Sequence, residues 1–347
     1  MTNNRNSYLD VAKFLFSIII VLYHFNTIFL GGYIVVEAFF MISGYFMMKS
    51  IKKSDENEPW GISTVKFVTH KYSLIAYYLI PAAIIGCIAY IYILPRETSD
   101  VIMQATLVLF EMVPLQTVGY NGFFTTGVAW YLSALLLASA IVYPLAKKFK
   151  VNFTFFICPL VSIFIYGYLI HNFNAIKNAN SWIENLFHSG LLRGIAGLCA
   201  GCFLHECSER LKAVKITVTG KIIFTVFEIL GWAYCILIMC KYPKLMYDAV
   251  VVFLMFGLLL IGINRYSYLS YLIQFKWTKH LATVSTIIYL NHYYWAQFIW
   301  KQFPEYSDKK QFILYICLIA GSSAIVYGAG KLAMFIVKKI KPKIIAN

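Results

Sequence analysis

Charged residues are scarce in this chain of 347 residues: only 13% are Asp, Glu, Lys or Arg, and only 15 are acidic. A water-soluble domain usually carries about 25% charged residues, so the composition excludes an ordinary soluble enzyme. The chain is instead 60% hydrophobic and 18% aromatic, with a mean hydropathy of +0.70. These values predict a polytopic protein of the lipid bilayer.

Several catalytic and binding signatures are also missing. There is no P-loop, G-x-G-x-x-G, H-E-x-x-H or G-x-S-x-G motif, which argues against ATPase, dinucleotide-binding, zinc-protease and hydrolase chemistry. The net charge of +15 forms no basic stripe with interleaved aromatics, so we expect no nucleic-acid partner. The eight cysteines are scattered, and no motif predicts a disulfide framework or a metal site. Cys199 and Cys202 lie in a run of small residues that predicts close helix packing.

Ten apolar runs are long enough to cross a hydrocarbon layer of roughly 30 Å, which needs about 20 residues per helix. They cover residues 9–30, 33–49, 72–94, 128–146, 152–171, 185–207, 221–241, 245–263, 281–303 and 311–337. Most of the Lys and Arg residues fall on one side if both termini are cytoplasmic, and this sets the orientation. We therefore expect an all-α fold of about ten transmembrane helices, in a single membrane-embedded domain over residues 1–347.

One further apolar run, residues 101–119, does not fit as a crossing. A full span there would place Lys147, Lys148 and Lys150 outside, against the distribution of the other basic residues. We predict a re-entrant or interfacial helix on the outer side, followed by the glycine-containing loop 119–122. Non-helical backbone at that depth is tolerated against protein or a water-filled cavity, so this segment is expected to cover the site.

The first apolar run carries polar residues along one side. Lys13 and His24 are eleven positions apart, and at about 100° and 1.5 Å per residue this step returns to within roughly 20° while rising roughly 16 Å. Asp10 and Ser17 fall near the same stripe. Ionisable groups at membrane depth are costly and seldom kept without a role, so this stripe is the first candidate for function.

Glu37 is expected at the same depth as His24, because the two lie near the outer ends of consecutive antiparallel helices. A carboxylate beside a histidine fixes its tautomer and raises its basicity, as a general base requires. The alternative is a satisfied buried pair that only holds the two helices together.

Arg193 and His292 are the other intramembrane candidates. A guanidinium keeps its charge, so Arg193 must lie near an anion or a water-filled cavity. For His292 the alternative is a packed, hydrogen-bonded core residue. On the inner side, Lys71 is expected near Lys13, in a cluster that either suits a phosphate-rich ligand or only reflects the cytoplasmic bias of lysine.

These residues resemble signatures of the acyltransferase-3 family of integral membrane O-acyltransferases. The pair Leu9-Asp10, the basic Lys13 and His24 match the opening signature of that family in order and spacing. The second run is similar to a signature of an acidic residue, an aromatic pair and Ser-Gly, here Glu37, Phe39, Phe40, Ser43 and Gly44. Residues 67–71, 130–133, 192–201 and 285–292 resemble later signatures.

The resemblance implies transfer of an acyl group, usually acetyl from cytoplasmic acetyl-CoA, to a hydroxyl of a cell-surface polysaccharide or its lipid-linked precursor. It places the protein in the bacterial cytoplasmic membrane. His24, oriented by Glu37, would act as the base or as a transient acyl carrier, while Arg193 or His292 stabilises the oxyanion. Lys13 and Lys71 would hold the phosphates of the donor, whose arm runs past Ser17.

Two other functions stay open. A transporter or flippase for an anionic or lipid-linked glycan is the main alternative, because buried charges also mark translocation paths. Against it, the sequence shows no paired halves with interrupted helices in corresponding positions. A non-catalytic module that binds an extracellular ligand is the second alternative. The oligomeric state is left open.

Overall fold

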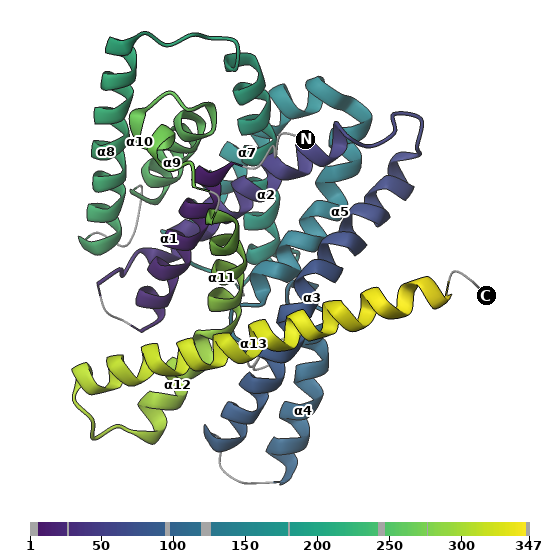
Figure 1. Ribbon diagram of the computed structural model, residues 1–347, viewed down its shortest axis with the longest axis vertical. Helices are drawn as coiled ribbons and strands as arrows, with labels where there is room; N and C mark the ends of the chain where they lie inside the picture. Colours follow the sequence, from purple (N-terminus) through teal and green to yellow (C-terminus); the bar gives the residue numbers. More distant parts are fainter. Residues whose placement is uncertain are drawn as a thin grey trace. The chain divides into compact units, whose positions relative to one another are not determined.

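The computed structural model describes residues 6–25, 28–93, 98–118, 126–179, 181–241, 247–275 and 277–344. Helices make up nearly all of the fold (Figure 1). The first five are α1 (Ser7–His24), α2 (Val35–Ile51), α3 (Trp60–Ile93), α4 (Thr98–Met112) and α5 (Trp130–Val151). The next four are α6 (Cys158–Phe173), α7 (Ser189–Leu211), α8 (Val218–Lys241) and α9 (Tyr247–Asn264). The last four are α10 (Tyr268–Leu272), α11 (Thr278–Asn291), α12 (Tyr293–Gln302) and α13 (Asp308–Ile344).

Short elements join these helices. They are 3-10 turns at Gly32–Ile34 and Gln116–Val118, a π-helical segment at Asn152–Ile157, and a hairpin of the strands β1 (Trp182–Ile183) and β2 (Phe187–His188). The hairpin ends at His188, so α7 begins at Ser189. The expected span began earlier, at residue 185.

The described residues contain seven stretches that are long and apolar enough to cross a membrane. The prediction of a mainly helical fold with helices able to span a membrane is therefore confirmed, while the number of crossings and the cytoplasmic position of both termini stay predictions. One stretch, Trp130–Phe173, covers two of the expected spans. Its backbone leaves helical geometry at Lys150, with φ of 47° and ψ of −130°, so a local break lies between α5 and α6.

Two expected helix boundaries are wrong. α1 ends at His24 and not near residue 30, because its 18 residues already rise about 27 Å, close to the thickness of the hydrocarbon layer. The imidazole therefore lies at the end of the helix. α3 begins at Trp60, directly after Pro59, a residue favoured where helices start. The segment that carries Lys66 and Lys71, expected as a loop, is thus helical.

Residues 281–303, expected as one helix, form two helices, α11 and α12, that meet at His292, and a crossing there stays a prediction. The Asn291 side chain donates to the Ser323 hydroxyl at 2.7 Å and to the Ile319 carbonyl at 3.4 Å. Asparagine offers such competing bonds and is a poor helix former, which favours a break at this point. Hydropathy is continuous across the break and gave no sign of it.

The chain forms two compact units. The first comprises residues 1–68 and 133–282, and its centre is the contact of α2 with α7. A β-carbon at Gly44 would lie 2.3 Å from the carbonyl oxygen of Leu198, and one at Gly201 would lie 2.1 Å from that of Met41. Glycine is therefore required at both positions, and the backbones of α2 and α7 touch. The predicted close packing around the buried free thiols of Cys199 and Cys202 is confirmed.

The second unit comprises residues 69–132 and 283–347. The Tyr72 hydroxyl donates to the Met112 carbonyl at 2.7 Å and joins α3 to the end of α4. The Trp295 ring nitrogen donates to the Ser322 hydroxyl at 2.8 Å and joins α12 to α13. α4, with 15 residues, falls within the run predicted to be re-entrant, and that placement stays a prediction. The loop 119–122 lies outside the described residues.

Candidate functional site

α1 carries the polar stripe predicted from the sequence. The helix is α-helical without interruption from Ser7 to His24, so Lys13 and His24 do share one helix. His24 is half-buried, and its ring centroid lies 4.8 Å from that of Tyr23. Ser17 is buried, and its hydroxyl donates to the Phe14 carbonyl at 2.7 Å, which leaves the hydroxyl oxygen as an acceptor. The ammonium group of Lys13 lies 4.9 Å from the centroid of the Phe46 ring.

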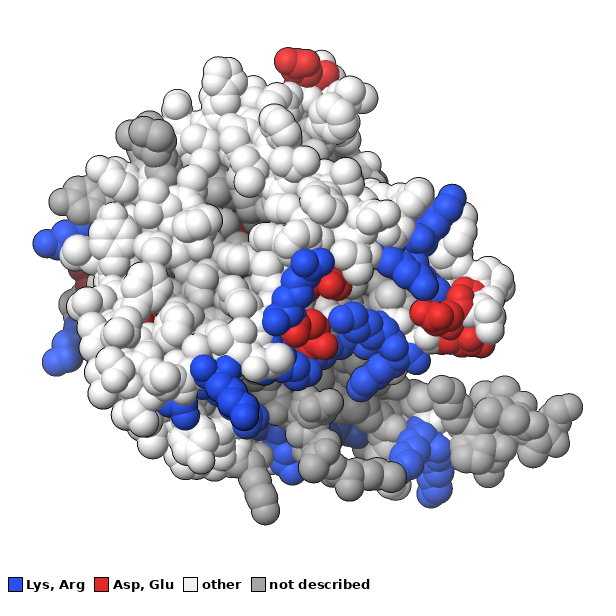
Figure 2. Space-filling model, turned by 90° about the horizontal axis from the view of Figure 1, so that it is seen from above, with Lys and Arg blue, Asp and Glu red and all other residues white. Residues whose placement is uncertain are grey.

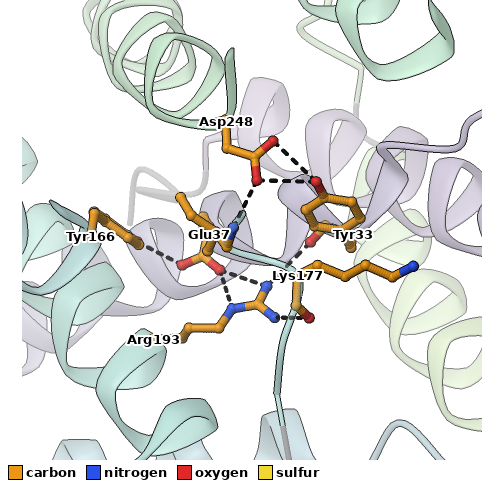
Figure 3. A network of polar contacts seen from close by, with 7 residues as sticks. Tyr33, Glu37, Tyr166, Lys177, Arg193 and Asp248 are labelled. Carbon is orange, nitrogen blue, oxygen red and sulfur yellow. Dashed lines mark hydrogen bonds and ion pairs between the residues drawn. The ribbon is translucent and has the colours of Figure 1, made fainter. Parts of the chain in front are cut away.

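Glu37 and Arg193 form a buried ion pair, drawn in Figure 3. The side chains are 0% and 1% exposed, and both Nε and Nη2 of Arg193 lie 2.7 Å from Oε1 of Glu37. The hydroxyl of Tyr166, on α6, donates to Oε2 of Glu37 at 2.6 Å. The carboxylate therefore has a donor on each oxygen, and the requirement of Arg193 for an anion is met.

This pair corrects the expected contact between Glu37 and His24. Both oxygens of Glu37 receive hydrogen bonds from Arg193 and Tyr166, so its partner is a permanent cation and not the imidazole. The reason is electrostatic, because a guanidinium inside the membrane cannot shed its charge and holds the nearest carboxylate more firmly than a neutral ring does. A role of Glu37 in orienting His24 is not supported by these contacts.

A second carboxylate, Asp248 at the start of α9, extends the network. The Tyr33 hydroxyl donates to both oxygens of Asp248, at 3.0 and 3.1 Å, and the backbone N–H of Ile176 donates at 2.7 Å. Arg193 in turn donates from Nη1 to the Lys177 carbonyl at 3.2 Å and from Nη2 to the Tyr33 carbonyl at 3.3 Å. Two carboxylates and one guanidinium thus hold the segment after α6 against α2, α7 and α9 (Figure 3).

Arg193 is consequently bound on most of its donors. A guanidinium has five N–H groups, and four of them are occupied by Glu37 and by the carbonyls of Tyr33 and Lys177. These contacts give Arg193 a structural role, because it joins α7 to Glu37 of α2 and to the carbonyls of Tyr33 and Lys177. The sequence did not single out Tyr33, Tyr166 or Asp248, since tyrosines are common in this chain and Asp248 lies near the end of the apolar run 245–263. The one sequence feature that pointed to this network was the charge of Arg193 within an apolar run, which requires an anion and hydrogen-bond acceptors nearby.

His292 lies in the second unit, at the junction of α11 and α12, and is fully buried. Its Nδ1 is 2.8 Å from the Tyr289 carbonyl and 3.1 Å from the Ile288 carbonyl. A carbonyl only accepts, so Nδ1 carries the proton and the neutral ring presents Nε2 as an acceptor. In this tautomer the ring can take up a proton, and it can donate to an oxyanion only after doing so.

The backbone beside His292 is held by a third carboxylate. Glu111, buried on α4, accepts from the Thr126 N–H at 2.9 Å and from its hydroxyl at 2.8 Å. The Tyr289 hydroxyl donates to the Val128 carbonyl at 3.2 Å. Gly127, with φ of +61°, has space for no side chain, because a β-carbon would lie 2.1 Å from the Tyr293 ring. Residues 126–128 therefore contact both Tyr289 and Tyr293, the tyrosines on either side of His292 in the sequence.

Lys71 is half-buried on α3 and belongs to the second unit, whereas Lys13 belongs to the first. The expected joint action of the two lysines stays a prediction. Within the described ranges, no group of three or more His, Cys, Asp or Glu residues is suited to hold a metal ion.

Comparison with known proteins gives one match. A family model described as an acyltransferase domain matches residues 6–330 of the chain. Searches of curated proteins and of solved structures found no match.

Proposed function

The chain belongs to the acyltransferase-3 family of membrane acyltransferases, and from this we propose that it transfers an acetyl group from cytoplasmic acetyl-CoA to a glycan hydroxyl. The acceptor in this proposal is a cell-surface polysaccharide or its lipid-linked precursor, and the membrane is the bacterial cytoplasmic membrane. Acetyl-CoA is a co-substrate of the reaction.

The observation that carries the proposal is the unbroken helix α1. Lys13 and His24 lie on one stripe of it, roughly 16 Å apart along the axis. Coenzyme A has its phosphates at one end and its thioester at the end of a long, slender arm. A lysine nearer the first end of α1 and an imidazole at its last residue suit the two ends of such a donor.

His24 performs the chemistry in this proposal. As a base it takes the proton of the acceptor hydroxyl while the oxygen attacks the thioester carbonyl; the carbon–sulfur bond then breaks, and the thiolate of coenzyme A takes up a proton. As an acyl carrier, its ring nitrogen attacks the thioester carbonyl, the carbon–sulfur bond breaks, and coenzyme A leaves as a thiolate that takes up the ring proton. The acceptor oxygen then attacks the acetylated ring, the nitrogen–carbon bond breaks, and the ring takes the hydroxyl proton. Both routes need an imidazole at the end of α1.

The remaining site residues support that step. Lys13 and Lys71 hold phosphates, and Ser17 lies along the path of the arm. Glu37 and Arg193 hold the frame of the first unit, which their burial and mutual hydrogen bonds favour. His292 serves as a second proton acceptor, and it becomes a donor to the oxyanion once it is protonated.

The test is chemical analysis of the glycan. Proton NMR of surface polysaccharide is compared between cells with the intact gene, without it, and with the His24→Ala variant. We expect ester-acetyl signals only with the intact gene, and an exposed-histidine variant, His280→Ala, should keep them. Unchanged ester signals in the deletion would overturn the proposal. Loss of unmodified glycan from the surface would indicate a transporter, and no change in the glycan would indicate a binding module.

A further inference from the structure

Lys49, a lysine that the sequence did not single out, shares an aromatic neighbour with Lys13. Lys49 lies one turn after Phe46 on α2, and its ammonium group is 5.9 Å from the centroid of the Phe46 ring. The ammonium group of Lys13 on α1 lies 4.9 Å from the centroid of the same ring. Two cations from two helices therefore share one aromatic side chain. Lys49 also lies 4.8 Å from the centroid of the Tyr45 ring.

The surrounding charge is unbalanced. Glu209 on α7 is shared by Lys212 at 3.1 Å and Lys52 at 3.9 Å, while Lys49 forms no ion pair among the described residues. Like charges held close together repel one another unless an anion lies between them. Figure 2 shows a face of the molecule on which Lys and Arg gather, with fewer Asp and Glu among them.

A cavity is lined by the residues that flank Lys49 in sequence, Met48 and Ile51. Lys52, three residues after Lys49, lines a space of about 260 Å³ at the ends of α2, α5 and α7. Its other walls include the apolar side chains of Met48, Ile51, Ala146 and Val151, together with Lys147, Lys150, Glu56 and Glu206. Three lysines and two carboxylates thus line a space that also offers an apolar wall to a flat group.

We infer that Lys49 binds a phosphate group together with Lys13, and that the ligand is the nucleotide end of the thioester donor; this inference rests on the proposed function. The two ammonium groups supply point charges from two helices, at 4.9 and 5.9 Å from the centroid of one ring, so a ligand with more than one phosphate oxygen can reach both. The headgroup of an anionic phospholipid has the same phosphate chemistry, so the experiment has to distinguish the two sources.

The test compares two acetyl donors that share the thioester and its arm. Acetyl-CoA carries the phosphates and the nucleoside, whereas S-acetylpantetheine carries neither. In membrane vesicles with their own glycan, Lys49→Gln should raise KM for acetyl-CoA by about tenfold, the loss expected for one charge-assisted hydrogen bond, and leave kcat within about twofold. KM for S-acetylpantetheine should not change. Lys49→Arg should restore the value for acetyl-CoA.

Direct binding provides a measurement that needs no acceptor. For the purified full-length chain in nanodiscs, calorimetry should show Kd for coenzyme A raised about tenfold in Lys49→Gln. The matched control is Lys221→Gln, because Lys221 also lies near two aromatic rings, 5.9 Å from the centroids of Tyr268 and Tyr271. It should leave Kd unchanged.

The outcomes separate the inference from the function on which it rests. Normal Kd in a folded Lys49→Gln protein would overturn the inference and leave the proposed function intact. If the wild-type protein itself binds no coenzyme A, the proposed donor is wrong. If phosphatidylglycerol in the nanodisc raises the thermal stability of wild type but not of Lys49→Gln, while Kd for coenzyme A is equal, the phosphate belongs to a lipid and the donor assignment fails.

Discussion

Arg193 and His292 are both buried, yet the two regions around them satisfy a buried polar side chain in opposite ways. Arg193 is neutralised by Glu37 from another helix and tied further to two carbonyls. His292 is held by carbonyls of its own helix, at the point where α11 gives way to α12. The first arrangement fixes charge and position together. The second fixes only the orientation of the ring, so its protonation can still change.

The largest expected effect comes from breaking the ion pair. Glu37→Gln should lower the free energy of unfolding by about 3–5 kcal/mol, because it leaves a buried guanidinium without its counter-charge. SDS titration in mixed micelles measures this quantity. The double variant Glu37→Leu, Arg193→Met should lose clearly less than the sum of the two single variants, since it removes both charges. Additive losses would show that the pair is not the main interaction of either side chain.

Substitution of His292 should affect the rate of acetyl transfer far more than the stability of the protein, in contrast to substitution of Glu37. Replacement of His292 by Gln should reduce the rate of acetyl transfer by about a hundredfold or more, the contribution typical of a general acid or base, with a loss of only about 1 kcal/mol in stability. Incorporation of labelled acetyl into glycan and unfolding of the purified protein give the two numbers. An inactive variant that has also lost several kcal/mol would place His292 with Arg193 as a structural residue.

A smaller effect is expected from Tyr166. Tyr166→Phe removes the donor to Oε2 of Glu37, and a hydrogen bond to a buried charged group contributes about 1.5–3 kcal/mol. Tyr168, on the same helix and half-buried, provides the control, and Tyr168→Phe should change the stability by less than about 0.5 kcal/mol. Equal effects of the two variants would mean that Arg193 alone satisfies the carboxylate.

The smallest effect concerns an ion pair outside the membrane. Hydrogen bonds from Lys66 and Ser63 hold the pKa of the Glu58 carboxyl below its usual range. A lowered pKa in the folded state means that the stabilisation is present at neutral pH and is lost as the pH falls through that lowered pKa. The Tm of wild type should therefore exceed that of Glu58→Gln slightly at pH 7, and the difference should disappear as the pH falls through the lowered pKa of Glu58. A difference independent of pH would exclude the ion pair as its cause.

The sequence predicted those features that depend on one segment at a time. Hydropathy located most helices, and the eleven-residue step placed Lys13 and His24 on one helix, as the structure confirms. The charge of Arg193 correctly predicted an anion nearby.

Features that depend on contacts between segments were not predictable in the same way. Glu37 had two basic candidates at comparable depth, His24 and Arg193, and only the packing of α2 on α7 selects between them. The break at His292 depends on bonds from Asn291 to α13, which no periodicity within residues 281–303 reports. The hydroxyl groups of Tyr33 and Tyr166 gave no signal because the chain has 26 tyrosines.

The glycines at positions 44 and 201 have a consequence for how substrates meet. The backbones of α2 and α7 are in direct contact at these glycines, with no side chains between them. The ion pair of Glu37 and Arg193 also joins the same two helices, so they cannot readily slide past one another. A carrier that alternates between two sides needs one bundle to rock against another, and this seam cannot serve as that hinge. In the proposed reaction, donor and acceptor therefore each move to a site whose walls on α2 and α7 stay in place.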